Sequence, residues 1–281
     1  MGKIKILFIA VFALSFVACG QQKKAFLSPA GYDLNRPQQF VMPESLFEIS
    51  GVAFHTRVPE VIYAEQDEEG KVFSYNLQTK DVHSVKFGKG GDYEDLAIGG
   101  EQVYVLRSDG RIVGFSFSDL RSGEIRDVKE WKEVLPKAEY EGMFFDPGSK
   151  LLYVLCKDCP SEFRKGEAGG YMLKVSGENV TRAGRFAVSG IFPKEGKEKN
   201  RKMKPSAIAK NPLTGKWFIL SSVNRLLVVA NKKWQVEHAY PLNPDVFRQP
   251  EGIAFDPSGN LYISNEGSQT HAANILKFSL K

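Results

Sequence analysis

The chain has 281 residues, of which 42% are hydrophobic and 25% are charged, and its formal net charge is +5. These values are typical of a folded globular protein with a sizeable core, and they argue against a disordered chain. Most of the positive excess lies in one stretch, from Lys194 to Lys204, without interleaved aromatic residues. We therefore expect no nucleic-acid binding.

The N-terminus has the features of an export signal. Lys3 and Lys5 precede an apolar run over Ile6–Val17, which is too short to span a bilayer, so residues 1–18 are predicted to be a cleaved signal peptide. Ala18 directly precedes Cys19, as in a bacterial lipobox, with Phe16 where leucine is usual. We expect lipidation of Cys19 and a membrane anchor through its acyl chains. The alternative is ordinary cleavage near Ala18 with a free Cys19.

The residues that follow are expected to form a tether. Residues 19–36 are polar and rich in turn-forming residues, without hydrophobic periodicity. Gly20 is not an aspartate, so an inner-membrane retention signal is absent, which favours an outer-membrane lipoprotein facing the periplasm. No later segment is long and apolar enough for a transmembrane helix. We expect a monomer.

Two further cysteines, Cys156 and Cys159, are separated by two residues. In an oxidising compartment this spacing favours a structural disulfide. Free thiols are the next alternative, and a metal site is the last, because the four histidines do not cluster in the sequence.

One sequence motif occurs five times. It opens with serine or glutamate and continues into an apolar strand, a turn and two further strands. The opening residues are Ser50, Glu94, Glu141, Ser206 and Glu251. A repeat in the forties with several short strands per unit is typical of a β-propeller.

We therefore predict an all-β fold, a β-propeller of five blades over residues 37–281. Six blades remain an alternative if Arg182–Ile191 forms a degenerate blade within the longer third interval. The last copy offers only three strands, and Pro37–Met42 supplies a spare extended segment. Pairing that N-terminal strand with the last blade would close the ring and remove an open sheet edge.

The ordered set of opening pairs resembles the SdiA-regulated family of bacterial β-propellers. The family order of Ser-Gly and Glu-Gly pairs is matched by Ser and Glu in all five copies, with glycine replaced at Asp95 and Ala207. The resemblance covers about Pro43 to Leu280 and implies the propeller fold. It also implies a link of some members to calcium, within a wider set of propellers that includes phytases and lactonases.

Equivalent positions in successive blades should surround the propeller axis. Glu94, Glu141 and Glu251 are therefore expected at one mouth of the central channel, with Ser50 and Ser206 between them. Three carboxylates brought together repel, and either proton uptake or a bound cation relieves the repulsion. Calcium is the candidate cation because it accepts six to eight oxygens in flexible geometry. The alternative is that these side chains bond the backbone of the neighbouring blade and brace the ring, and both roles can coexist.

A second set of polar residues follows the second strand of each copy. Asp67, Asp109, Asp158 and Glu266 are candidates to line a pocket on that face, with Asp67 and Glu266 as additional polar groups of the channel mouth. The alternative is an ordinary solvated surface.

The favoured function is a binding module that holds a divalent cation and presents one face to a small-molecule or protein ligand. The alternatives are a metal-dependent hydrolase of the phytase or lactonase kind and a structural scaffold of the envelope. The sequence contains no nucleophile elbow and no zinc-protease motif, so it indicates no catalytic residue.

Overall fold

The computed structural model describes residues 25–160, 162–164, 167–177, 179–190 and 203–281. The predicted signal peptide, Cys19 and most of the basic stretch lie outside the described residues. None of the helices in the described part of the chain is long and apolar enough to cross a membrane.

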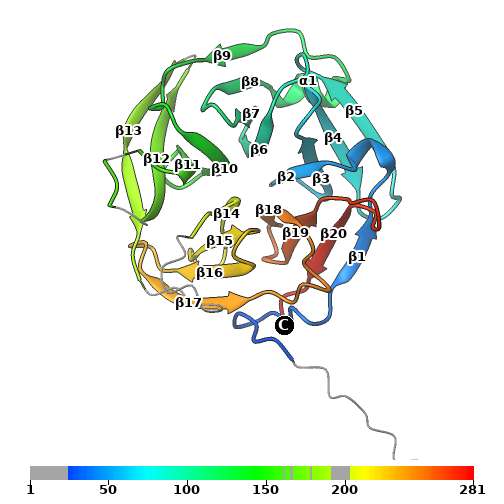
Figure 1. The fold of residues 1–281 in the computed structure, drawn as a ribbon. Coiled ribbons are helices and arrows are strands. Elements are labelled where there is room, and N and C mark those ends of the chain that lie inside the picture. Colours follow the sequence, from blue (N-terminus) through cyan, green and yellow to red (C-terminus); the bar gives the residue numbers. More distant parts are fainter. Residues whose placement is uncertain (1–24, 161, 165–166, 178, 191–202) are drawn as a thin grey trace, which may run out of the picture.

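Five antiparallel sheets of four strands each surround a central axis (Figure 1). The first blade comprises β2 (Ile49–His55), β3 (Val58–Gln66), β4 (Lys71–Asn76) and β5 (Val82–Lys86). The second comprises β6 (Tyr93–Gly99), β7 (Gln102–Arg107), β8 (Ile112–Ser116) and β9 (Lys129–Trp131). The third comprises β10 (Glu139–Asp146), β11 (Leu151–Asp158), β12 (Ala168–Ser176) and β13 (Asn179–Val188). The fourth comprises β14 (Ala207–Lys210), β15 (Trp217–Ser221), β16 (Leu226–Ala230) and β17 (Val236–Pro241). The fifth comprises β18 (Pro250–Phe255), β19 (Leu261–Asn265), β20 (Asn274–Phe278) and β1 (Gln38–Val41).

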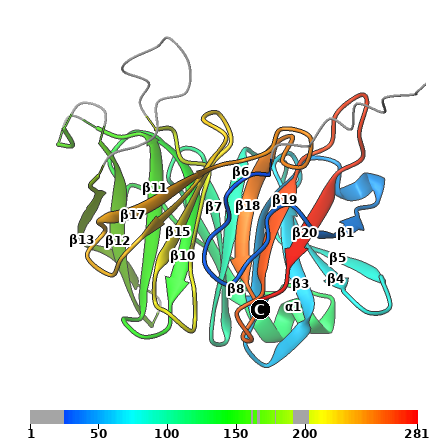
Figure 2. The same ribbon diagram turned by 90° about the horizontal axis from the view of Figure 1, so that it is seen from below.

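The ring closes as predicted. β1 pairs antiparallel with β20, from Gln38 opposite Lys277 to Val41 opposite Asn274, so that the outermost strand of the last blade comes from the N-terminal side of the chain. In the view of Figure 2, this N-terminal segment and the C-terminus lie close together. The backbone amide of Lys281 donates to the carbonyl of Gly31 over 2.9 Å.

The alternative of a sixth blade is wrong. Arg182–Val188 belongs to β13, which pairs with β12 as the outermost strand of the third blade. These two strands are among the longest of the fold, with 9 and 10 residues, and they account for part of the long third interval.

The hydrophobic core is divided among the five contacts between neighbouring blades. Each of five buried clusters combines residues of two adjacent blades, for example Tyr63 and Val72 with Leu96 and Val103. This division follows from strand alternation, since the two faces of each sheet pack against different neighbours. The core therefore holds the ring together at every blade boundary.

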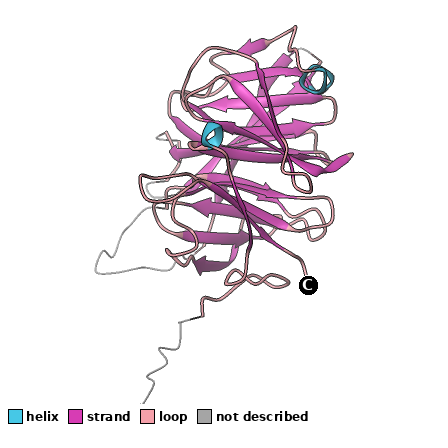
Figure 3. Cartoon of the chain, turned by 90° about the vertical axis from the view of Figure 1, so that its right-hand side faces the viewer, coloured by secondary structure: helices cyan, strands magenta, loops and turns pink. Residues whose placement is uncertain are grey.

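Helices are minor elements of the fold (Figure 3). In the described part of the chain, the 3-10 turn η1 (Glu44–Leu46) precedes the first blade, and α1 (Phe117–Ser122) connects β8 to β9. The Ser116 side chain caps α1 by accepting from the amide of Ser118, and Gly123 ends it at a φ of 83°.

The predicted tether ends earlier than residue 36. Tyr32 and Leu34 are only 6% and 2% exposed, and they belong to the cluster between the fourth and fifth blades. The Tyr32 hydroxyl donates to the Gly259 carbonyl over 2.6 Å and accepts from the Asn211 amide over 2.8 Å. The packed domain therefore includes residues that the sequence assigned to the tether, because two apolar side chains in that stretch reach the core.

Candidate functional site

The five opening residues lie at one end of the innermost strands. Ser50, Glu94, Glu141 and Glu251 are near the starts of β2, β6, β10 and β18, and Ser206 immediately precedes β14. All five line a single cavity of about 210 Å³. Residues up to 201 positions apart in the chain are thus brought together around the axis. The cavity that they line is here called the acidic mouth.

Other charged residues complete the acidic mouth. Glu48, Asp67 and Glu266 also line it, which gives six carboxyl groups against the two ammonium groups of Lys157 and Lys204. Two members of the second predicted set are not in this lining.

Asp109 and Asp158 are engaged elsewhere. Asp109 lies 3.1 Å from Arg111, and Asp158 lies 3.3 Å from Lys204. The expectation that all four loop acids would line one pocket was therefore wrong for these two residues, although Lys204, the partner of Asp158, does line the cavity.

The two serines of the ring brace neighbouring blades. Ser50 Oγ donates to the Glu94 carbonyl over 2.9 Å, and Ser206 Oγ donates to the Pro250 carbonyl over 3.3 Å. Each bond crosses from one blade to the next. The bracing role weighed for the repeated residues thus describes the serines.

Two residues that the sequence did not single out contribute similar bonds. Asp95 Oδ2 accepts from the Met143 amide over 2.7 Å, which links the second blade to the third. Ser264 Oγ donates to the Ser50 carbonyl over 2.7 Å, which links the fifth blade to the first. Asp95 stands at one of the two positions where the family glycine is missing, so this departure has a structural role.

The three glutamates differ from the serines. Among the described residues, no backbone amide donates to the carboxylates of Glu94, Glu141 or Glu251. The partner of Glu141 is Lys157, whose ammonium lies 2.5 Å from Glu141 Oε1 and 3.5 Å from Glu139 Oε1. Among the described residues, Lys157 is the one cationic side chain within hydrogen-bond distance of a ring carboxylate. Sequence analysis did not identify it as a site residue.

Burial and mutual repulsion raise the pKa of the cavity carboxyls. Burial, reinforced by the carboxylate of Glu141, raises the pKa of Glu94 to about 9 and that of Glu251 to about 7. Burial also raises the pKa of Glu266 to about 8, with help from a hydrogen bond to Glu48, and that of Asp67 to about 6. The cavity carboxyls therefore hold their protons more tightly than isolated carboxyls do.

Lys157 is held in its charged form by the same neighbours. Burial alone would lower the pKa of Lys157, but the hydrogen bond to Glu141 and the attraction of the Glu141, Glu139 and Glu94 carboxylates together outweigh burial and raise that pKa. The pKa of Glu141 is still raised, because burial of its carboxyl exceeds the help from Lys157. A single lysine thus offsets only part of the negative charge.

Two further acids lie buried beside the mouth. Glu65 is completely buried, and its Oε1 accepts from the Gly51 amide over 2.6 Å while its Oε2 has no hydrogen-bond partner. Burial raises the pKa of Glu65 to about 8, and it raises that of Asp95 well above its usual value. The neutral form of Glu65 is therefore the dominant one at neutral pH.

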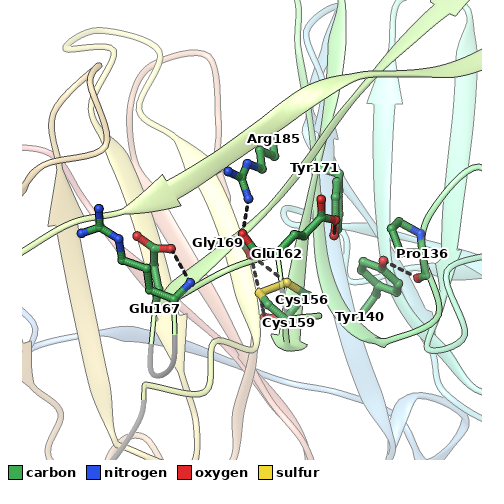
Figure 4. Close-up of a disulfide and its surroundings, with 10 residues drawn as sticks. Pro136, Tyr140, Cys156, Cys159, Glu162, Glu167, Gly169, Tyr171 and Arg185 are labelled. Carbon is green, nitrogen blue, oxygen red and sulfur yellow. Dashed lines mark hydrogen bonds between the residues drawn. A yellow bond between two sulfur atoms is a disulfide. The ribbon is translucent and has the colours of Figure 1, made fainter.

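Cys156 and Cys159 form a disulfide at the end of β11 (Figure 4). Their Cα atoms are 5.1 Å apart, and Cys156 is fully buried beside the carbonyl of Gly169. Lys157 lies between the two cysteines in the chain. The covalent loop therefore fixes the backbone that carries the ammonium group into the acidic mouth.

The middle of the axial channel is apolar. The residues two positions after the opening residues of each copy meet there, namely Val52, Leu96, Met143, Ile208 and Ile253. They line a space of only about 70 Å³. The acidic mouth is therefore separated from the other end of the axis.

The side-chain arrangement bears on whether the acidic mouth can hold a metal ion. Within the described ranges, no three His, Cys, Asp or Glu residues are clustered closely enough to hold a metal ion. One orphaned atom lies at the cavity, since Asp67 Oδ1 is buried without a hydrogen-bond partner. The donor set of carboxylate and hydroxyl oxygens is the kind that suits a hard cation such as calcium.

The fold and this site define a five-bladed β-propeller with an acidic cavity at one end of its axis. The chain belongs to the SdiA-regulated family, whose model matches residues 48–269. Comparison with curated proteins gave no match.

Several solved propellers are similar in structure. Glutaminyl cyclase from Myxococcus xanthus is 12% identical with a TM-score of 0.56, over 87% of this chain and 97% of the other. A luciferin-regenerating enzyme is 10% identical with a TM-score of 0.54, over 88% and 96%. Regucalcin, a calcium-binding protein from Agrobacterium tumefaciens, is 13% identical with a TM-score of 0.53, over 90% and 95%. At these identities the likeness concerns the fold alone.

Proposed function

We propose that this protein is a lipid-anchored, extracytoplasmic binding module whose acidic mouth holds a divalent cation, with calcium as the first candidate. The observation that carries the proposal is the convergence of Glu94, Glu141 and Glu251 from three blades on one cavity. Burial and neighbouring carboxylates raise the pKa values of all three, so a bound cation would stabilise their charged forms.

The size and chemistry of the cavity favour a small cation over a large ligand. Its volume of about 210 Å³ is below the range of about 300–1,000 Å³ that is usual for organic ligands. Calcium tolerates irregular oxygen coordination, whereas magnesium requires a near-ideal octahedron. Glu94, Glu251 and Asp67 would supply carboxylate oxygens only after moving closer together, since they are not clustered closely enough in the structure, and Lys157 would compete with the cation for Glu141.

The proposed location rests on the N-terminal sequence. A signal peptide over residues 1–18 and lipidation of Cys19 would deliver the domain to the outer membrane, facing the periplasm. Changing Cys19 to serine should abolish incorporation of radiolabelled palmitate and release the protein from membranes. Palmitate labelling that persists in this variant would contradict the proposed anchor.

A structural scaffold is the second candidate, and the bracing bonds favour it. Four of the five blade boundaries carry a side-chain bond that involves Ser50, Asp95, Ser206 or Ser264. On this alternative, replacing the ring glutamates changes stability without any change in cation response.

Calorimetric titration of the purified protein with calcium separates the two candidates. Wild-type protein should bind calcium, and Glu94→Gln and Glu251→Gln should each weaken binding at least tenfold because each removes a cavity carboxylate. Glu124→Gln is the matched control, since Glu124 is 72% exposed and does not line the mouth. The cation proposal fails if wild type shows no binding heat, or if the three variants bind alike.

The pH dependence gives a second test. Protons and calcium compete for carboxyls whose pKa values are about 7 for Glu251 and about 9 for Glu94. Calcium affinity should therefore rise between pH 6 and pH 9, and Lys157→Met should strengthen binding at every pH. An affinity that is flat over this range, or that falls in Lys157→Met, would argue against a site formed by these groups.

Hydrolytic activity is tested separately. Phosphate esters and lactones incubated with the calcium-loaded protein should remain intact if the chain is a binding module. Turnover that is lost in Glu94→Gln would instead favour the hydrolase alternative.

A further inference from the structure

A second and larger cavity lies at the other end of the innermost strands. It is lined by the residues four positions after the opening residue of each copy, namely Phe54, Ile98, Phe145, Lys210 and Phe255. Its volume is about 640 Å³, roughly three times that of the acidic mouth. The same repeat thus produces an acidic ring at one end of the axis and a mainly aromatic ring at the other, here called the aromatic mouth.

The walls of the aromatic mouth are turns that the sequence marks clearly. The turn after β10 contains Pro147, the turn after β14 spans Asn211–Gly215, and the turn after β18 contains Pro257. Asn211 Oδ1 accepts from the amides of Leu213 and Thr214, at 3.0 Å and 2.9 Å. Proline and these side-chain bonds restrict the turns, so the cavity is preformed.

Apolar side chains dominate the lining, although the cavity is open to solvent. Four of the five ring positions are apolar and only half-buried, and Phe144 adds a further ring. Leu213 is 60% exposed in the adjoining turn. Exposed apolar surface of this kind, gathered in a cavity of organic-ligand size, is typical of a small-molecule site.

The carboxylates in the lining are already satisfied by the protein. Asp146 is bonded by Ser149 over 2.8 Å and by Lys210 over 3.0 Å. Asp256 accepts from Asn260 over 2.7 Å and from the Tyr262 hydroxyl over 3.3 Å. Neither carboxylate needs a ligand, so the site is not built for a cation.

The two ammonium groups retain capacity for a ligand. Lys210 has three N–H donors, of which one is directed to Asp146, and its ammonium lies 5.3 Å from the centre of the Trp217 ring. Lys232, also in the lining, makes no ion pair with any other described residue. Both ammonium groups therefore have spare donors, and they can complement a negative charge.

We propose that the aromatic mouth binds a flat aromatic molecule that carries one anionic group, a carboxylate or a sulfonate. The aromatic body packs among Phe54, Phe145 and Phe255, where stacked or edge-on ring contacts are available. The anionic group accepts hydrogen bonds from Lys210 and Lys232. This ligand is distinct from the cation of the acidic mouth, because the apolar middle of the channel separates the two sites.

Fluorescence titration of the full-length protein with 8-anilinonaphthalene-1-sulfonate tests the proposal. This probe has the flat aromatic body and the anionic group, and it should bind with a dissociation constant in the micromolar range. Lys232→Met should weaken binding at least fivefold, and Lys210→Met should do so as well. Lys232→Met is the cleaner variant because it leaves no buried carboxylate without its partner.

A matched pair of surface variants tests the location. Leu213→Ser removes an exposed apolar side chain from the aromatic mouth, whereas Val223→Ser removes one from the acidic mouth, where Val223 is 52% exposed. Leu213→Ser should weaken probe binding by at least twofold, and Val223→Ser and Glu94→Gln should leave it unchanged. Near-ultraviolet circular dichroism confirms that each variant is folded, since partly unfolded proteins also bind this probe.

Competition identifies the ligand class. Displacement of the probe by 2-naphthoate at tenfold lower concentration than by the neutral 2-naphthylmethanol supports an aromatic anion, and equal displacement contradicts it. The proposal is overturned if folded wild type does not bind the probe, or if Leu213→Ser and Lys232→Met bind it as wild type does. Calcium binding that fails while probe binding persists would refute only the cation proposal, so the two failures are distinguishable.

Discussion

Individual acidic residues account for much of the unusual electrostatics of this protein. Glu65 and Asp95 lie under the acidic mouth, and both have raised pKa values because burial disfavours their charged forms. Glu65 nevertheless has a structural task, since it accepts the Gly51 amide at the start of the first innermost strand. A neutral carboxyl fulfils that task, and an ionised one would lack a partner for its second oxygen.

The Glu65 carboxyl should make stability depend on pH. Its pKa is about 8 in the folded protein, above the unfolded value of 4.5, so the folded state binds the proton more tightly. Its contribution is complete below about pH 4.5 and is lost as pH rises toward 8, by roughly 1.4 kcal/mol for each pH unit. Glu65→Gln should keep the acceptor for Gly51 and remove this slope.

Urea unfolding of wild type and Glu65→Gln at pH 5, 6, 7 and 8 measures the difference. The variant should be the less affected of the two by rising pH. Parallel stability curves for the two proteins would mean that Glu65 is not protonated in the folded state.

The positions of the site residues could be predicted from the sequence, but their partners could not. The five repeats placed Ser50, Glu94, Glu141, Ser206 and Glu251 at equivalent positions, and one cavity contains all of them. Lys157 escaped prediction because a lysine stands there in only one blade, at the position that Asp67 and Glu266 occupy in the first and fifth blades. A sequence repeat reveals only the residues that the blades share. A lysine that offsets the charge of the glutamates can come from a single blade, and the repeat does not reveal it.

At the scale of strands, the inner part of each blade was predictable, whereas the outermost strands, apart from β1, were not. The three inner strands carry apolar residues that are buried on both faces, as in β15 and β16. The outermost strands are short or mostly exposed, as in the three residues of β9 and the exposed pattern of β5. Without a buried face they lack the alternation that marks a strand in sequence.

Side-chain bonds between neighbouring blades should contribute unequally to stability. Ser264 Oγ donates to the Ser50 carbonyl and also accepts from the Gly252 amide over 2.7 Å, in a fully buried position. Ser50 Oγ makes one such bond in a half-buried position. Ser264→Ala should therefore cost about 2–3 kcal/mol of unfolding free energy, and Ser50→Ala about 1 kcal/mol.

Equilibrium urea denaturation of both alanine variants measures the two costs. Ser118→Ala, at an exposed position of α1, serves as a control that removes a hydroxyl without a link between blades. If Ser50→Ala proved as costly as Ser264→Ala, the ranking by number of bonds and burial would be wrong.

At the scale of the whole molecule, the ring depends on a strand that is remote in sequence from the blade it completes. Phe40 in β1 is 7% exposed and packs in the cluster between the fifth and first blades, whereas Val41, the next residue, is 61% exposed. The pair offers a matched comparison within one strand. Phe40→Ala should lower the free energy of unfolding by about 3 kcal/mol, and Val41→Ala should change it by less than about 0.5 kcal/mol.

Thermal unfolding followed by light scattering measures both effects. The Phe40 variant should also aggregate at a lower temperature, because loosening β1 leaves β20 as an open sheet edge. Equal melting temperatures for the two variants would show that the closing strand is not held by its buried side chain.

The apolar ring in the middle of the channel has a consequence for what the propeller can do. Val52, Leu96, Met143, Ile208 and Ile253 leave only about 70 Å³ between the two ends. A hydrated ion that entered this gap would have to lose its water in contact with apolar side chains, which is unfavourable. The apolar ring therefore blocks the passage of ions along the axis.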